Sequence, residues 1–345
     1  MIRIGVVGYG YWGPNLVRNF AQLNTTELVV VADKNEEQLD RVRSAYPYVD
    51  TTTDVENLFK YRLDAVIIAT PPPSHFSLAK DCLEHGLHVL VEKPLTLNSQ
   101  HAVELIDLAR QRGLILMVGH TFEYNPAVRK LKEIIDSGEL GRLLYIDTVR
   151  VNLGLLQQKL NVVWDLAPHD VSILHYLLGS TPDMVAAQGG DCIVEDLHDI
   201  AYLNLRFPER VLAHVHISWL DPCKVRRITV VGSKKMAVYD DVEPLEKIKI
   251  YDKGVDRIPY TDSFGDFQYS YHYGDVVIPH IRFSEPLRIE CQHFIDCITT
   301  GQQPQTDGVN GLNVIRVLEA AQQSLENGGG PVHLRTEEPA YVSTT

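Results

Sequence analysis

The fold of this chain is decided by the stretch Gly8-Tyr9-Gly10-Tyr11-Trp12-Gly13. An apolar run from Ile2 to Val7 leads into it, and a helix-like stretch and a second apolar run, residues 28–32, follow it and end at Asp33. This order predicts a strand, a glycine turn, a helix and a second strand with an acid at its tip. In such a turn the first glycine permits the tight bend, the second lets the backbone approach a pyrophosphate, and the third lets the helix pack close to the strand.

These residues predict a dinucleotide site. The helix that begins after Gly13 would face the phosphates with unpaired N–H groups and a partial positive charge. A carboxylate at Asp33 can accept hydrogen bonds from both ribose hydroxyls of an adenosine and would repel a 2′-phosphate. Asp33 therefore favours NAD over NADP, whereas Lys34, which directly follows it, argues the other way. The alternative is a glycine turn that only joins strand to helix, with Asp33 serving the turn.

Length, charge and cysteine content narrow the class of protein. The 345 residues suit two domains, and a net charge of -13 disfavours a nucleic-acid partner, because neutralising phosphates needs a basic surface. The five cysteines are scattered without a CxxC pair, which indicates reduced thiols and a cytoplasmic protein. The first strand begins at residue 2, which leaves no room for a signal peptide, and no apolar run suits a membrane helix.

Residues 1–121 are predicted to form one domain, because strand and helix patterns keep alternating after Asp33. Ser74 is expected to cap a helix that ends at Gly86, and Gly113 to end another. The predicted strands cover residues 2–7, 28–32, 64–70, 89–91 and 114–119, and the predicted helices residues 35–45, 55–61, 74–85 and 99–112. Such alternation is typical of a doubly wound parallel sheet, which binds ligands at the carboxyl ends of its strands.

That rule points to three further strand ends: Thr70-Pro71, Glu92-Lys93-Pro94 and Gly119-His120. Lys93 stands out, because a lysine at the mouth of a buried sheet and next to a proline is placed to act on a bound molecule. The Lys93–Pro94 peptide could be cis. The alternative is a surface lysine in a turn, and the sequence pattern alone leaves both open.

Residues 122–345 follow a different pattern and are predicted to form an α+β domain with a large, mainly antiparallel sheet. Asn125-Pro126 is a helix start, and Trp164-Asp165 opens a second helix. The other expected elements are strands over residues 143–152, 184–188, 201–207, 211–218, 226–231 and 236–239, a long loop over 255–283, and helices over 290–300 and 311–327.

Asp165 and His169 are four residues apart, so on a helix they share one face. A histidine titrates near neutral pH, where hydride chemistry needs a base, and the acid could orient its ring. The alternative is structural: Asp165 caps the helix, Pro168 lies in its first turn, and His169 is a polar residue of that turn.

Together these segments resemble the Gfo/Idh/MocA oxidoreductases, the family of glucose–fructose oxidoreductase and inositol dehydrogenase, over almost the whole chain. The resemblance implies a Rossmann domain followed by a domain whose open-faced sheet usually serves oligomerisation. The motifs that carry it are the glycine stretch 8–13, Ala69-Thr70-Pro71 with His75, Glu92-Lys93-Pro94, Gly119-His120 with Asn125-Pro126-Ala127, Asp165 with His169, and Thr300-Gly301, Pro304, Asp307-Gly308 and Gly311-Leu312.

The resemblance also implies roles. Lys93 matches the family's active-site lysine, and Asp165 and His169 match its catalytic acid and histidine. Many members carry a glycine midway between the last two, where this chain has Leu166-Ala167-Pro168. We expect no metal ligand. The expected cofactor contacts are Gly8, Gly10, Tyr11, Trp12, Gly13, Asp33, Thr70, Pro71, His75, Glu92 and Lys93, and the expected substrate contacts are Lys93, Tyr124, Asn125, Asp165 and His169.

Within the family, the segments 120–126 and 164–170 look most like nucleotide-sugar members. These include UDP-N-acetylglucosamine 3-dehydrogenases, their uronic-acid counterparts and 3-ketoreductases of deoxysugar pathways. The alternatives are a dehydrogenase of inositol or a free sugar and a non-catalytic NAD-binding regulator. We expect a homodimer or homotetramer, and an aminotransferase as a pathway partner. Cations for a diphosphate would come from Lys224, Arg226, Arg227, Lys234 and Lys235, or from Arg129, Arg150 and Lys159.

Overall fold

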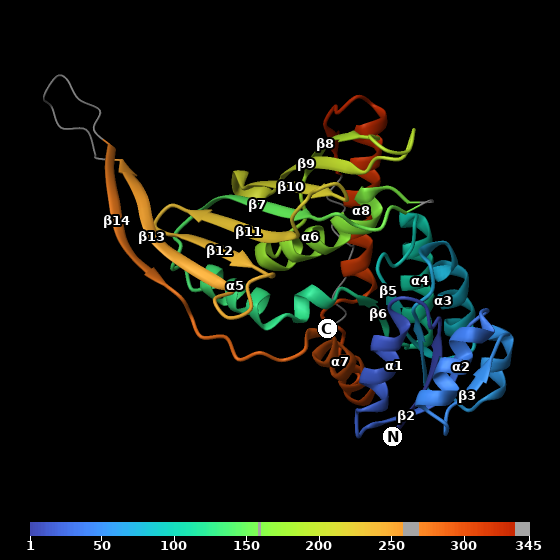
Figure 1. The fold of residues 1–345 in the computed structure, drawn as a ribbon. Coiled ribbons are helices and arrows are strands. Elements are labelled where there is room, and N and C mark those ends of the chain that lie inside the picture. The colour runs from blue at the N-terminus through green and yellow to red at the C-terminus, as the bar shows by residue number, and fades with distance from the viewer. Residues whose placement is uncertain (158–159, 258–268, 335–345) are drawn as a thin grey trace, which may run out of the picture. The chain divides into compact units, whose positions relative to one another are not determined.

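The computed structural model describes residues 1–157, 160–257 and 269–334, and Lys159 therefore lies outside the described residues. The chain packs into two compact units (Figure 1). One consists of Met1–Asn125 and Ser284–Arg316, the other of Pro126–Phe283 and Val317–Thr345. The segment 284–316, which the sequence analysis assigns to the second domain, thus belongs to the compact unit of the glycine stretch.

The first unit is built on a six-stranded sheet in the order β3-β2-β1-β4-β5-β6, in which all neighbouring strands are parallel. This confirms the doubly wound fold. The order reverses between β1 and β4, and ligands bind at such a switch point. The strands are β1 (Ile2–Val7), β2 (Thr26–Ala32), β3 (Asp50–Thr52), β4 (Ala65–Ile68), β5 (His88–Glu92) and β6 (Leu116–Gly119). The three residues of β3 gave no strand pattern in the sequence.

Helices complete the first unit. Its core joins β1 and β2 to α1 and α7, where Phe20 and Phe294 pack edge to face. The helices are α1 (Gly13–Ala21), α2 (Glu36–Ala45), α3 (His75–Glu84), α4 (Ser99–Arg112), α7 (Pro286–Thr300) and the start of α8 (Gly308–Glu326), with short 3-10 turns η1 (Val55–Lys60), η2 (Pro72–Ser74) and η3 (Thr121–Tyr124). Gly86 and Gly113 have positive φ and end α3 and α4 as predicted. Ser74 does not cap α3 with its side chain, because its hydroxyl donates to the Pro71 carbonyl.

The second unit holds a nine-stranded sheet in the order β14-β13-β12-β11-β7-β10-β9-β8-β15. β7 and β10 run parallel and the other neighbours antiparallel, which confirms the mainly antiparallel sheet. The strands are β7 (Leu143–Val151), β8 (Met184–Gly190), β9 (Ile200–Arg206), β10 (Leu212–Ser218), β11 (Val225–Gly232), β12 (Met236–Asp240), β13 (Ile248–Arg257), β14 (Tyr269–Val277) and β15 (Val332–His333), with a 3-10 turn η4 (Pro208–Arg210).

The expected loop over 255–283 is confirmed only at its C-terminal end, residues 278–283, and is wrong where strands form. Residues up to Arg257 continue β13, and Tyr269–Val277 form β14, which pairs with it. The glycines and aspartates of this segment suggested a loop, but hairpin partners override that composition. The middle of the expected loop, residues 258–268, lies outside the described residues.

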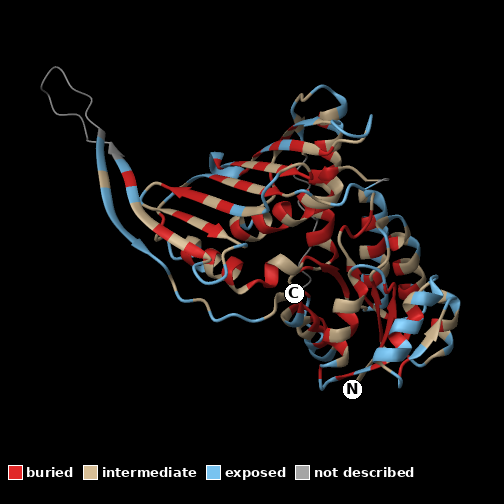
Figure 2. Cartoon of the chain, viewed as in Figure 1, coloured by how far each residue is buried: buried red, intermediate tan, exposed pale blue. Residues whose placement is uncertain are grey.

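One face of the nine-stranded sheet is covered and the other is open. Helices α5 (Pro126–Asp136) and α6 (Val162–Leu178) pack on the face to which Ala213, Val215 and Ile217 of β10 point. Burial alternates along the strands (Figure 2). The opposite face presents Tyr145, Tyr202 and Leu212, all exposed. In the described ranges, no helix is long and apolar enough to cross a membrane.

Candidate active site

The glycine stretch has the geometry that its sequence predicts. Gly8 has φ +98°, and a Cβ there would lie 2.6 Å from the carbonyl oxygen of Ala69, at the end of β4. A Cβ on Gly13 would overlap the Gly8 carbonyl oxygen, so the start of α1 sits directly against the turn. A Cβ on Gly10 would meet no atom within 4 Å, which leaves the backbone open on that side. The three positions therefore fit the approach of a pyrophosphate.

Asp33 connects the glycine stretch to the end of β2. Its Oδ2 accepts a hydrogen bond of 2.6 Å from the Tyr9 N–H, and its Oδ1 accepts one of 2.8 Å from the Asn35 N–H. An ionised carboxylate has about four acceptor sites, so two bonds leave others for a ribose. These bonds fix the orientation of the carboxylate beside the turn and fit a dinucleotide.

The residues after β4 form a tight local network. The Thr70 hydroxyl contacts the Ser74 hydroxyl at 2.7 Å. The buried His75 ring places Nε2 at 2.7 Å from the Thr70 carbonyl oxygen and Nδ1 at 2.8 Å from that of Pro94. Burial lowers the pKa of His75, and the two carbonyl contacts partly offset this effect. His75 therefore joins the end of β4 to the segment after β5, and its ring serves this connection.

Lys93 follows the last residue of β5, and its peptide bond to Pro94 is cis. The carboxyl group of Glu92 packs beneath the end of β6: a Cβ on Gly119 would lie 3.0 Å from its Cδ. Burial raises the pKa of Glu92 to about 7, and the charge and N–H of Lys93 and the Trp12 indole oppose this shift. The strand end thus combines a half-buried lysine with a carboxyl group that titrates near neutral pH.

Tyr124 lies in the core of the first unit. Its side chain is fully buried in the core of the first unit, and its hydroxyl lies 3.0 Å from the Thr306 hydroxyl. Burial raises its pKa above the ordinary value. Tyr124, the last residue of η3, is therefore part of the core, and its contact with a substrate stays a prediction. Asn125 is also buried and directly precedes α5, as expected of a residue at a helix start.

Asp165 and His169 lie within α6, one turn apart. Asn161 is the N-cap, and its side chain accepts hydrogen bonds from the N–H groups of Val163 and Trp164. The alternative in which Asp165 caps this helix is therefore wrong. The helix begins earlier than predicted, and Pro168 lies in its second turn. A proline there has no N–H to donate to the carbonyl group four residues earlier.

The Trp219 indole holds Asp165 in place. Its Nε1–H donates to Oδ2 of Asp165 at 3.0 Å, and the ring is buried after the end of β10. Gly154 packs against this ring, because a Cβ there would lie 3.2 Å from Cδ1 of Trp219. Sequence reasoning missed Trp219. Its only signal in the sequence was that a tryptophan directly follows the predicted strand 211–218.

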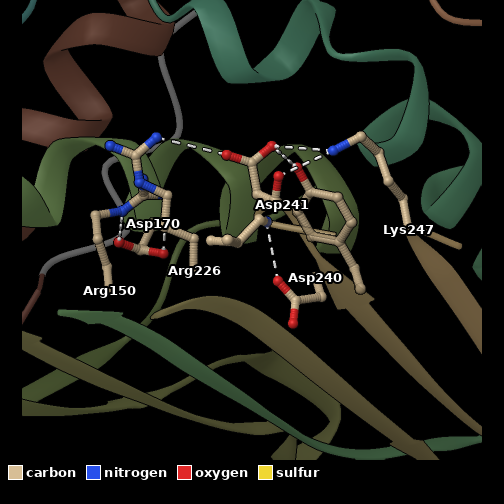
Figure 3. Close-up of polar contacts among 8 residues, drawn as sticks. Arg150, Asp170, Arg226, Asp240, Asp241 and Lys247 are labelled. Carbon is tan, nitrogen blue, oxygen red and sulfur yellow. Dashed lines mark hydrogen bonds and ion pairs between the residues drawn. The ribbon is translucent and has the colours of Figure 1, made fainter. Parts of the chain in front are cut away.

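A buried ion pair anchors α6 to the sheet. Nε of Arg150 on β7 lies 2.6 Å from Oδ2 of Asp170, and both side chains are buried (Figure 3). Asp170 directly follows His169, so the pair fixes the backbone on which the histidine is carried. Arg150 was considered as a cation for a diphosphate, and this role is corrected: its guanidinium is used inside the fold.

Other cations considered for a diphosphate lie in or next to β11 and β12 of the second unit. Arg226 lies 3.5 Å from Asp241, whose other oxygen accepts from the Tyr239 hydroxyl (Figure 3). Lys235 pairs with Glu139 at 2.9 Å. The exposed positions are Lys224, Arg227 and Lys234.

The structure places the predicted residues in two sets. The glycine stretch, Asp33, Thr70, Pro71, His75, Glu92 and Lys93 belong to the first unit, and Asp165 and His169 to the second. Within the first set, hydrogen bonds join Asp33 to the glycine stretch and His75 to Thr70. Among the described residues, no group of histidine, cysteine, aspartate and glutamate is arranged to hold a metal ion.

Two family models match this chain. Residues 2–120 match the oxidoreductase family with an NAD-binding Rossmann fold, and residues 128–238 match the GFO/IDH/MocA C-terminal domain. The chain therefore belongs to the Gfo/Idh/MocA family. It is an NAD(P)-dependent oxidoreductase that acts on CH–OH groups, and its first unit is the NAD(P)-binding domain.

Individual relatives extend over the whole chain. The UDP-N-acetylglucosamine 3-dehydrogenase of Acidithiobacillus ferrooxidans is 27% identical over 328 residues, which are 93% of this chain and 96% of the relative. Its solved structure, GnnA, matches with a TM-score of 0.78 at 25% identity and covers 94% of this chain and 98% of that one. The myo-inositol 2-dehydrogenase of Thermotoga maritima is 25% identical over 337 residues, 94% of this chain and 96% of the relative. GenD2 from gentamicin A biosynthesis, in complex with NAD, shares the fold, with a TM-score of 0.81 at 20% identity over 97% and 96% of the chains.

Proposed function

We propose that this Gfo/Idh/MocA oxidoreductase transfers a hydride between C3 of a nucleotide sugar and NAD, with UDP-N-acetylglucosamine or its uronic acid as the substrate. The observation that carries the proposal is the pair Asp165 and His169, one turn apart on α6, with Asp165 held by the Trp219 indole. The 27% identity to a UDP-N-acetylglucosamine 3-dehydrogenase supports the choice of sugar.

In this proposal the side chains divide the work at one oxygen atom. His169 accepts the proton of the C3 hydroxyl, and Lys93 donates a hydrogen bond to the same oxygen as negative charge develops there. Asp165, oriented by Trp219, holds Lys93 or His169 in position. The nicotinamide supplies the hydride acceptor when it is bound. In the opposite direction, His169 returns the proton to a ketone oxygen.

Asp33 supports NAD as the cofactor. Two backbone N–H groups orient its carboxylate, which would accept from the ribose hydroxyls and repel a 2′-phosphate. Because hydrogen bonds to charged groups contribute about 1.5–3 kcal/mol, we expect Asp33→Ser to raise the KM for NAD by about 10–100-fold and to improve use of NADP. A wild-type protein that prefers NADP would contradict this assignment.

The direct test is nicotinamide reduction with a panel of UDP- and dTDP-sugars, free hexoses and inositols, with a carbonyl trap to pull the equilibrium. We expect activity with UDP-N-acetylglucosamine or its uronic acid. Lys93→Ala should lower turnover on the order of 100-fold, since a donor to a developing oxyanion contributes about 3 kcal/mol. NAD should still bind to this variant, and unchanged turnover would remove Lys93 from the mechanism.

The second candidate is oxidation of a free polyol such as inositol, which the similarity to a myo-inositol 2-dehydrogenase favours. Activity with inositols and none with nucleotide sugars would establish it. Reduction of a 3-keto sugar with NADH as the faster reaction would instead indicate a ketoreductase. Tight NAD binding without turnover in either direction would support a regulator.

Self-association is part of the proposal. The open face of the nine-stranded sheet, defined here by Tyr145, Tyr202 and Leu212, exposes large apolar side chains on neighbouring strands. We expect a homodimer or homotetramer through this face in sedimentation equilibrium, and dissociation by Leu212→Asp. An aminotransferase that converts a 3-keto product to a 3-amino sugar would be the partner in the pathway.

A further inference from the structure

Two buried carboxyl groups have no role in the proposed chemistry: Glu92, which precedes Lys93, and Glu290, which faces Glu92. Glu290 on α7 is fully buried; its Oε2 accepts a hydrogen bond of 2.6 Å from the Thr121 hydroxyl, and its Oε1 has no hydrogen-bond partner. Oε1 of Glu92 is likewise buried without a hydrogen-bond partner. All of these residues belong to the first unit. The arrangement leaves one oxygen of each carboxyl group unsatisfied in the interior.

The surroundings of the pair supply one cation and several acceptors. Lys93, which follows β5, acts on Glu92 together with the Trp12 indole of the glycine stretch. Glu290 faces Glu92, the Thr121 hydroxyl and the carboxylate of Glu123 on η3, and its neighbour on α7 is the buried thiol of Cys291. Glu123 has its own donors, because the amides of Asn310 and Gln305 lie 3.1 Å and 3.3 Å from its oxygens. In the part of the chain that the structure describes, no ion pair joins Glu290 to a lysine, arginine or histidine.

A buried carboxylate without a cation is strongly disfavoured and takes up a proton instead. The net charge of two such carboxyl groups and one ammonium group is zero when one carboxyl group is ionised and the other is neutral. We propose that Glu290 holds a proton at neutral pH, so that it and Glu92 together offer Lys93 a single negative charge. Glu290 is then a positioning residue for Lys93, and this role rests on the proposed function of Lys93.

The titration of both groups agrees with this assignment. Burial raises the pKa of Glu290 well above its ordinary value, and the charges of Glu92 and Glu123 raise it further. Burial also raises the pKa of Glu92, but the charge of Lys93 opposes the shift. The proton therefore belongs on Glu290, which has no cation beside it, and the charge on Glu92.

Infrared spectroscopy of the full chain tests the proton directly and needs no substrate. At pH 7 we expect a carbonyl band of a buried protonated carboxylic acid that shifts in D₂O. The band should lose most of its intensity in Glu290→Gln, leaving only the share that Glu92 contributes with its pKa of about 7. It should persist in Glu92→Gln and in the control Asp296→Asn, an exposed residue of the same helix. No such band in the wild type, or a band lost in Glu92→Gln and kept in Glu290→Gln, would overturn the proposal.

A second variant keeps the test decisive if Glu290→Gln does not fold. Thr121→Val removes the hydroxyl that donates to Oε2, which would be the carbonyl oxygen of a neutral Glu290. The band should therefore move to higher frequency, because a carbonyl that loses a hydrogen bond stiffens. A band at unchanged frequency in this variant would show that the proton resides elsewhere.

The pH profile of kcat/KM tests the link to Lys93. Glu92→Gln removes a negative charge that acts on Lys93 and should move the alkaline limb to lower pH by about one unit or more, since an opposite charge within reach has effects of that size. Glu290→Gln replaces a neutral group by a neutral group and should move the limb less than half as far. An equal shift in both would overturn the proposal. An enzyme inactive on every sugar would defeat the proposed function, while the infrared result would still decide the proton.

Discussion

The two segments that carry the candidate catalytic side chains are supported in opposite ways. Helix α6 is held by a matched ion pair, Arg150 with Asp170, and by the Trp219 indole on Asp165. The end of β5 rests on Glu92 and Glu290, two buried carboxyl groups with Lys93 as their cation. A buried carboxyl group without a cation of its own takes up a proton, and burial raises the pKa of Glu92 to about 7. The support of β5 should therefore respond to pH near neutrality.

The largest effect separates chemistry from cofactor binding. His169→Ala should lower kcat by about 10²–10⁴-fold, the usual contribution of a positioned base, because it removes the group that accepts the hydroxyl proton. NAD affinity, measured by calorimetry, should not change, since the residues expected to bind NAD belong to the first unit. The control is His101→Gln, which alters an exposed histidine of α4. A retained kcat would exclude His169 as the base.

Breaking the ion pair of Arg150 and Asp170 should cause the largest loss of stability. Arg150→Met leaves Asp170 buried without its partner and should lower the free energy of unfolding by about 3–5 kcal/mol. Urea unfolding of Arg150→Met/Asp170→Leu should recover a large part of this loss, because no charge is then stranded. The exposed pair of Arg43 and Glu36 is the control, and Arg43→Met should cost far less, because solvent screens an exposed ion pair. Equal losses in the two single variants would contradict the anchoring role of Arg150.

The unmatched pair should make stability depend on pH. The pKa of Glu92 is raised from 4.5 to about 7 by burial, so the folded state binds this proton more tightly than the unfolded chain does. Its contribution is fully present below pH 4.5 and is lost as the pH rises to about 7, a change on the order of 3 kcal/mol. Glu92→Gln should lack this decline in urea unfolding between these values. Parallel pH profiles for variant and wild type would refute the comparison of the two supports.

The smallest expected effect concerns the orientation of Asp165. Trp219→Phe keeps the ring but removes the N–H that donates to Oδ2. One hydrogen bond contributes about 1 kcal/mol, so kcat should fall by roughly fivefold, while the free energy of unfolding changes little. Stopped-flow turnover at saturating substrate measures it. If kcat is untouched, the indole only fills space.

The sequence predicted the local geometry of the first unit well, because its signals are local. A Cβ on Gly13 would meet the Gly8 carbonyl oxygen within the same turn, and Asp33 accepts a hydrogen bond from the N–H of Asn35, two residues on. The contacts of Gly8 with Ala69 and of Asp33 with Tyr9 span longer sequence distances. The cap at Asn161 was missed, since Asp165 and Pro168 offered a competing helix start of similar quality.

Supports formed over long sequence distances could not be predicted. Trp219 contacts Asp165 across 54 positions, and Arg150 was considered as one possible cation for a diphosphate because nothing local indicated its buried partner, Asp170, 20 positions away. Tyr124 was predicted to contact the substrate, and its hydroxyl contact with Thr306, 182 positions away, could not be predicted from the sequence. Likewise, part of the expected loop forms β14, because it pairs with β13.

The most direct test of the account is nicotinamide reduction by the wild type and by His169→Ala, with NAD and UDP-N-acetylglucosamine or its uronic acid as the only substrates. The account predicts NADH formation by the wild type and a loss of about 10²–10⁴-fold in the variant, with NAD bound equally by both. Equal rates in wild type and variant would contradict the central claim. So would a wild type that binds NAD but neither forms NADH with any sugar nor oxidises NADH with any keto sugar.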